Sequence, residues 1–346
     1  NNNVTSPPPT ATSNPFGGTE IPSEKVAKKE DTVAVDTSQK TYSIKTLLRA
    51  LVDNDGSDLH ITVGLPPIIR IHGKLTKLNL PNLTIPDITR LTNELLSDKQ
   101  RIRFKEELEI DFSYEIEDLA RFRVNAFNQR LGPAAVFRVI PTKIKTLEEL
   151  GIPKYLENLS AKHKGFVLCT GPTGSGKSTT LAALVDKCNE TRHDHIITIE
   201  DPIEFVHFPK RCIINQREVG PHTHSFGAAL KSALREDPDI ILVGEMRDFE
   251  TISLAITAAE TGHLVFATLH TISAAGAIDR IIDVFPPHQQ DQIRTQLSDV
   301  IVAIIAQQLI PTKNGKGRCC GLEVLMGTAP VKNLIREGLS LIHISE

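Results

Sequence analysis

The stretch FVLCTGPTGSGKS, residues 166–178, indicates both the fold class and a ligand of this chain. Its first part, Phe166–Thr170, is mostly apolar and predicts a buried strand. The remainder, GPTGSGKS at 171–178, is a complete phosphate-binding loop, and apolar residues then recur at helical spacing over 179–189. A strand, a glycine-rich loop and a helix in this order predict an α/β domain with a site for a nucleoside triphosphate.

The chemistry of this P-loop follows from its residue types. Glycines let successive backbone N–H groups converge on phosphate oxygens, and the helix N-terminus adds a partial positive charge. Lys177 is expected to reach the β- and γ-phosphates, and the Ser178 hydroxyl is expected to ligate Mg²⁺. A glycine-rich turn without a ligand is the alternative, which the agreement of motif and context disfavours. The predicted nucleotide-binding residues are Gly171, Pro172, Thr173, Gly174, Ser175, Gly176, Lys177, Ser178 and Thr179.

The overall composition is that of an ordinary globular protein. Of 346 residues, 40% are hydrophobic and 23% are charged, and the formal net charge of −3 gives no electrostatic reason to expect nucleic-acid binding. The five cysteines form no CxxC pair and no zinc spacing, which is typical of reduced thiols. The apolar run 300–305 is too short to cross a bilayer, so we expect no transmembrane segment. Because the chain begins with Asn1 and not with Met, we expect its natural start to lie upstream.

Composition and periodicity divide the chain into several parts. Residues 1–40 are rich in Asn, Pro, Thr, Ser and Lys and are expected to be disordered. Residues 41–141 mix alternating strand patterns with a helical pattern at 87–104, which predicts a small α+β domain built on an antiparallel sheet. A linker is expected at 142–150 and a second domain from 151, in which strands alternate with helices from Gly165 onward, as in a parallel sheet.

Polar side chains follow the predicted parallel strands at the edge where ligands of such sheets lie. Glu200, Asp201 and Glu204 follow one strand, Glu245 follows a second, and His270 follows a third. Acidic clusters are often solvated faces, but one of these carboxylates is a candidate general base for hydrolysis. Spacing alone does not choose among them.

Glu245 and the histidines each have a structural alternative. Glu245 ends a run of aliphatic residues, where it can hold Mg²⁺ through water or simply cap a strand. His263 and His270 flank the predicted strand 264–268. They are candidate sensors of the γ-phosphate, although a lone histidine more often has a structural role.

Several long motifs resemble those of the secretion ATPase superfamily, the hexameric motors of type II and type IV secretion and of type IV pili. In the second half they are GPTGSGKS at 171–178, IEDPIE at 199–204, ALREDPDIILVGE at 233–245, TGH at 261–263 and LH at 269–270. The pilus retraction (twitching-motility) branch is indicated by SDLHI at 57–61, GLPP at 64–67, Arg70, Gly73, RFRVNAF at 121–127 and NLIRE at 333–337. The resemblance covers about residues 42–338. The absence of the four-cysteine zinc insertion that extension and secretion relatives usually carry also favours retraction.

The resemblance implies roles for matched positions. Glu204 becomes the general base, and Glu245 becomes the group that positions Mg²⁺ or water. His263 and His270 become nucleotide-sensing residues. Arg123 and Arg138, in the first domain, would reach the nucleotide of the large domain, although both can also be ordinary solvated strand residues.

The resemblance also implies an architecture and partners. A PAS-like domain at 41–141 would precede a RecA-like domain at 151–338 that binds ATP and Mg²⁺. The protein would form a homo-hexamer in the cytoplasm, peripheral to the inner membrane through a pilus platform protein. A pilus extension or secretion motor, a regulatory ATP-binding module without turnover, and a DNA-handling relative are the alternatives. Two departures are the extension at 1–40 and the segment 339–346, which does not resemble the family and suggests a truncated or incorrectly joined end.

Overall fold

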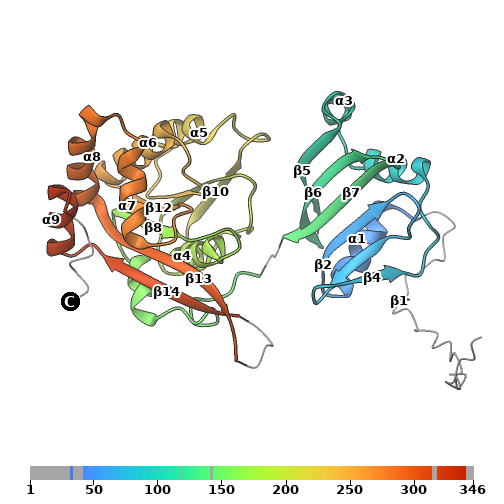
Figure 1. Cartoon of the computed structure of the whole chain (residues 1–346), viewed down its shortest axis with the longest axis horizontal. Coiled ribbons are helices and arrows are strands. Elements are labelled where there is room, and N and C mark those ends of the chain that lie inside the picture. The colour runs from blue at the N-terminus through green and yellow to red at the C-terminus, as the bar shows by residue number, and fades with distance from the viewer. Residues whose placement is uncertain (1–31, 34–41, 118, 141–142, 314–317, 340–346) are drawn as a thin grey trace, which may run out of the picture.

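The computed structural model describes residues 32–33, 42–117, 119–140, 143–313 and 318–339. The chain forms two units, each built around its own seven-stranded sheet (Figure 1). The first unit comprises residues 42–140 together with Thr32–Val33, and the second comprises residues 143–339. The predicted disorder of 1–40 and the predicted non-family tail 339–346 lie almost wholly outside the described residues.

The first unit is an α+β fold, as the sequence predicts. Its strand order is β1-β4-β3-β2-β7-β6-β5, and all neighbouring strands are antiparallel except β1 and β4. Helix α1 buries Leu47, Leu48 and Leu51 against the sheet, as their helical spacing predicts. The elements are β1 (Thr32–Val33), α1 (Ile44–Asp53), β2 (Gly56–Thr62), β3 (Ile68–Ile71), β4 (Lys74–Leu78), α2 (Ile85–Asn93), α3 (Asp98–Glu107), β5 (Glu109–Ile116), β6 (Ala120–Gln129) and β7 (Gly132–Ile140).

Two local predictions for this unit are wrong. The helix predicted over 87–104 is two helices, because Ser97 caps a new helix and exchanges capping-box hydrogen bonds with Gln100. Thr32 and Val33, predicted to be disordered, form strand β1 along the free edge of β4, where edge-strand backbone groups are available for pairing.

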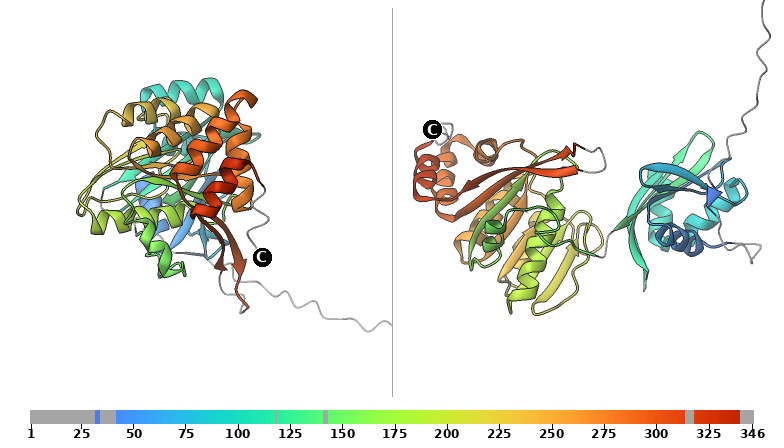
Figure 2. Two further views of the ribbon diagram at one scale, coloured as in Figure 1. Left: turned by 90° about the vertical axis from the view of Figure 1, so that its left-hand side faces the viewer. Right: turned by 90° about the horizontal axis from the view of Figure 1, so that it is seen from below.

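The second unit is an α/β fold in which β10-β9-β11-β12-β8-β13 are parallel and β14 is antiparallel to β13. The β13–β14 hairpin is long and runs out beyond the helices (Figure 2). The elements are η1 (Lys154–Leu159), β8 (Gly165–Thr170), α4 (Lys177–Thr191), β9 (His195–Glu200), β10 (Ile213–Glu218), α5 (Phe226–Ala233), β11 (Ile240–Val243), α6 (Phe249–Glu260), β12 (Leu264–Thr268), α7 (Ala274–Asp283), α8 (Pro287–Val300), β13 (Ile301–Pro311), β14 (Arg318–Met326) and α9 (Ala329–Glu337).

The central strands of the second unit are buried on both faces. Phe166 and Leu168 of β8 lie in a core with α5 to α9, whereas Val167 and Cys169 lie in a second core with η1 and α4. Successive side chains of a strand point to opposite faces, so a strand between two layers of helices is apolar throughout. Leu147, in the predicted linker 142–150, is buried in the second core, so part of that segment packs with the second unit.

Candidate functional site

The P-loop connects β8 to α4, as predicted. Gly171, Gly174 and Gly176 have φ angles of 142°, 77° and 90°, in the region that favours glycine. A Cβ atom at Gly176 would stand 2.8 Å from the side-chain amide nitrogen of Gln307, so the loop also lacks room for a larger residue there. The glycines therefore serve both backbone conformation and close packing.

Lys177 lies within this loop and is only 7% exposed. Its ammonium group donates hydrogen bonds to the carbonyl oxygens of Gly171, at 2.8 Å, and Pro172, at 3.1 Å. Burial lowers the pKa of Lys177, while Cys169, Glu245 and Glu204 act in the opposite direction. The charge is thus held at the loop, where phosphate oxygens are expected.

Gln307 of β13 anchors the loop, and sequence reasoning missed it. Its amide nitrogen donates to the carbonyl oxygen of Ser175, and its amide oxygen accepts from the Thr180 hydroxyl, both at 2.8 Å. The side chain is 3% exposed, so neither bond can be replaced readily by water. Gln307 therefore ties the P-loop and the first turn of α4 to the neighbouring strand.

We expect Gln307→Ala to lower the free energy of unfolding by about 2–4 kcal/mol, because it leaves a buried carbonyl and a buried hydroxyl without partners. Gln308→Ala is the matched control, since Gln308 is the next residue of β13 and is exposed. Its effect should stay within about 0.5 kcal/mol. Denaturant unfolding of both variants measures the difference, and equal effects would contradict the anchoring role.

The P-loop lies in a cavity of about 470 Å³, which we call the P-loop cavity. Residues from both units line it. The P-loop and α4 contribute Thr173, Gly174, Gly176, Lys177, Ser178 and Thr179. The end of β9 and the loops after β9 and β11 contribute the carboxylates of Glu200, Asp201, Glu204 and Glu245. The remaining charged or titratable lining residues are Arg123, Arg138, His207, His270 and Arg318. Gly171, Pro172 and Ser175 belong to the same loop but do not line the cavity. Nearly all of the predicted site is thereby gathered around one space.

The carboxylates of Glu200 and Glu204 differ in their surroundings. Glu200 is 8% exposed and accepts hydrogen bonds from Thr198 Oγ1 at 2.7 Å and from Gln216 Nε2 at 3.2 Å. Its second oxygen accepts the backbone N–H of Glu204 at 3.2 Å. Glu204 is exposed, and its carboxylate has no hydrogen-bond or ion-pair partner among the described residues. Glu200 thus supports the loop after β9 that carries Glu204, and Glu204 presents a free carboxylate to the cavity.

Burial raises the pKa of Glu200 to about 7 from 4.5, although the hydrogen bonds from Thr198, Glu204 and Gln216 oppose the shift. Between these two values the folded protein keeps a proton that the unfolded chain has lost. We therefore expect wild-type stability to fall by about 3 kcal/mol as the pH rises from 4.5 through 7, through this group alone. Glu200→Gln should flatten that part of the profile in denaturant titrations at several pH values, and an unchanged profile would contradict the assignment.

Glu245 joins His270 in the cavity. Its Oε1 atom lies 2.8 Å from His270 Nε2, and Arg247 binds both carboxylate oxygens at 2.5 and 2.6 Å. Burial would raise the pKa of Glu245, but Arg247 and His270 outweigh it and lower the pKa. Glu245 is therefore a carboxylate held in its charged form, and it lines the same cavity as Ser178.

The arginines come from the outer face of the first unit's sheet. Arg138 donates from Nε to Asp58 Oδ1 at 2.9 Å, and its side chain is 68% exposed. Arg123 lies beside Arg138 in the β6–β7 pairing and has no polar side-chain partner in the described ranges. Both arginines line the P-loop cavity, where the nucleotide is predicted to bind.

His263 does not lie with the residues that line the P-loop cavity. It precedes β12, whereas His270 follows that strand, so the two histidines lie at opposite edges of the sheet. The Nδ1 atom of His263 lies 2.8 Å from the carbonyl oxygen of Ala258, and the residue does not line the P-loop cavity. The structure therefore contradicts a nucleotide contact by His263 within its own chain and places it in the turn after α6.

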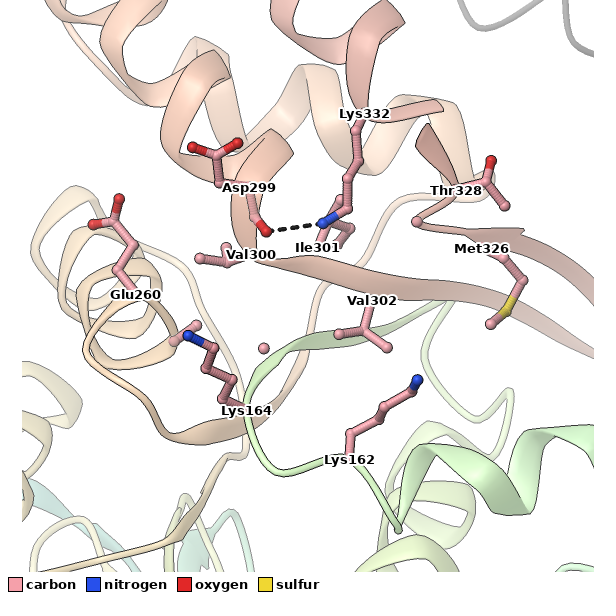
Figure 3. A pocket seen from close by; sticks show the side chains of 13 residues that line it. Lys162, Lys164, Glu260, Asp299, Val300, Ile301, Val302, Met326, Thr328 and Lys332 are labelled. Carbon is pink, nitrogen blue, oxygen red and sulfur yellow. Dashed lines mark hydrogen bonds between the residues drawn. The ribbon is translucent and has the colours of Figure 1, made fainter. Parts of the chain in front are cut away.

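A second cavity, of about 630 Å³, lies at the edge of the sheet where β8 begins. Figure 3 shows Lys162 and Lys164 on one side of it, and Lys332 donating to the carbonyl oxygen of Asp299 on the other. No predicted site residue lines this cavity. Its place at the opposite edge from the P-loop separates it from the chemistry described above.

Neither a membrane-spanning helix nor a cluster of metal-ligating side chains is present among the described residues. None of the helices resolved there combines the length and the apolar character that a bilayer span requires. No group of three or more His, Cys, Asp or Glu side chains in that part of the chain is arranged to hold a metal ion.

Comparison with known proteins places the chain in a family. Residues 34–336 match the model of the type II/IV secretion system protein family. A Pseudomonas aeruginosa relative described as the type IV pilus retraction ATPase PilT is 55% identical over 294 residues, which are 85% of each chain. A Neisseria gonorrhoeae twitching motility protein is 52% identical over 296 residues, 86% of this chain and 79% of the relative.

The structure is also similar to a solved one. The crystal structure of the pilus retraction motor PilT with bound ADP superposes with a TM-score of 0.82 at 47% identity, over 86% of this chain and 87% of that one. The match of the family model and the identity to these relatives both extend over most of the sequence. This chain is therefore a member of the type II/IV secretion system protein family.

Proposed function

We propose that this protein is an ATP-hydrolysing motor that drives retraction of type IV pili. The observation that carries the proposal is the P-loop cavity, where a complete phosphate-binding loop, acidic side chains and arginines of the other unit meet. Relatives described as a retraction ATPase and a twitching motility protein, each more than half identical, support the retraction assignment.

The side chains that line the cavity have different proposed roles in hydrolysis. The loop N–H groups and Lys177 bind and orient the phosphates, and Glu204, whose carboxylate is free, takes a proton from the attacking water. Arg123 and Arg138 neutralise the charge that spreads over the γ-phosphoryl oxygens. His270, which contacts Glu245, would sense the terminal phosphate.

The cavity also suits Mg²⁺. Ser178 and Glu245 supply the hard oxygen donors that this ion prefers, and Mg²⁺ sites in nucleotide enzymes use few protein ligands beside the phosphates. Bound there, the ion would offset phosphate charge. Glu245 would act through water, because Arg247 already occupies both of its oxygens.

The architecture proposed with this function is a RecA-like second unit preceded by a PAS-like first unit, in a homo-hexamer. The P-loop, the parallel sheet and the similarity to the PilT structure support it. The ring would work in the cytoplasm against a pilus platform protein at the inner membrane, without a nucleic-acid partner. The resemblance also implies that the segment 333–337 transmits the nucleotide state to the retraction machinery, and it would do so through exposed positions of α9, because Ile335 is buried in the core.

Complementation tests the retraction assignment. Expression of this protein should restore twitching to a pilus-retraction mutant, and the purified protein should release phosphate from ATP. Turnover without restored twitching would favour an extension or secretion motor. Nucleotide binding without turnover would favour a regulatory module and overturn the motor.

A further inference from the structure

An ion pair connects the two units beside the P-loop cavity. Arg121 of β6 donates from Nη2 to Glu218 Oε2 at 2.7 Å, and Glu218 ends β10 in the second unit. Ser113 of β5 donates to the other oxygen of Glu218 at 3.2 Å and accepts from Arg121 at 2.9 Å. The side chains of Arg121 and Glu218 are 13% and 4% exposed, so this contact is largely shielded from water.

Each partner of this pair is directly linked to a proposed catalytic side chain. Arg121 lies two residues before Arg123, and residues two apart on a strand share a face. The same Glu218 oxygen that binds Arg121 accepts the backbone N–H of Ile203 at 3.2 Å, and Glu204 is the next residue. One carboxylate therefore holds both the arginine-bearing sheet and the loop of the proposed base.

We propose that Arg121 and Glu218 are positioning residues for ATP hydrolysis, which fix Arg123 and Glu204 relative to one another at the nucleotide site. The inference rests on the proposed ATPase function. Neither residue lines the P-loop cavity, so neither is expected to touch ATP. Their effect is on the geometry of groups that do, where small displacements change rates strongly.

The test measures kcat, KM, ADP affinity and thermal stability of the full chain. Arg121→Ala should lower kcat on the order of 10- to 100-fold, with ADP affinity nearly unchanged because the P-loop is intact. It should also lower the melting temperature, because Glu218 is left as a buried charge without its partner. Arg103→Ala is the matched control, because Arg103 pairs with Glu107 on the surface of the first unit. Its loss should change neither kcat nor the melting temperature.

The double variant Arg121→Ala/Glu218→Gln separates positioning from stability. Removing the buried charge should restore the melting temperature, while kcat should stay low because the contact of Arg121 with the second unit is still missing. Wild-type kcat in Arg121→Ala, or recovery of kcat together with stability in the double variant, would overturn the inference and leave the ATPase assignment standing. A wild-type protein that releases no phosphate would instead overturn the proposed function itself.

Discussion

Lys177→Ala should abolish ATP turnover, with a fall in kcat on the order of 100-fold or more. The substitution removes a cation that is 7% exposed and fixed at the P-loop by two backbone carbonyls. A charge-assisted contact is worth about 1.5–3 kcal/mol in ordinary cases, and more where charge develops in a transition state. Steady-state phosphate release measures the effect, and a melting curve checks that the variant is folded.

Lys231→Ala serves as the control for this experiment. Lys231 lies on α5 in the same unit, is exposed and does not line the P-loop cavity. Its replacement should leave turnover unchanged. A folded Lys177→Ala protein with wild-type phosphate release would remove the basis for placing the nucleotide at this loop.

Glu204→Gln should keep ATP affinity but lose hydrolysis by about 10²- to 10⁴-fold. The amide retains the shape and hydrogen-bonding capacity of the side chain but cannot accept the proton of the attacking water. The exposed, unpartnered carboxylate of Glu204 fits this role, because it is free to approach a water molecule in the cavity. Single-turnover hydrolysis and equilibrium binding of ATP separate the two effects.

Glu200→Gln is the comparison variant for Glu204→Gln. Glu200 is buried and bonded to Thr198, Gln216 and the Glu204 backbone, so its replacement should cause the smaller loss of activity. The opposite order of effects would move the general base from Glu204 to Glu200.

The sequence predicted the features that depend on neighbouring residues. The P-loop could be identified because its glycines, Lys177 and Ser178 are contiguous and follow a buried strand. The acidic groups and His270 could be placed because parallel strands end at one edge of a sheet. The same rule would have excluded His263, which precedes β12 and so stands roughly 17 Å along the strand from its end.

Contacts between distant segments could not be predicted in this way. Gln307 binds a carbonyl oxygen 132 residues away, and Arg121 binds a carboxylate 97 residues away. Neither side chain belongs to a local pattern, and a glutamine in a strand or an arginine on a sheet face is an ordinary residue in the sequence. The fold of the second unit brings Gln307 to the P-loop, and the arrangement of the two units brings Arg121 to Glu218.

The alternation of β8 between two cores limits how the length of this chain can change. Deleting one residue from β8 would exchange the side chains facing α4 with those facing α5 to α9, and it would draw the P-loop back by about 3.3 Å relative to Gln307. The packing of both cores and the hydrogen bonds of Gln307 to the P-loop region would be lost together. Insertions and deletions within β8 are therefore incompatible with activity, and in this strand the number of residues is as strictly specified as their identity.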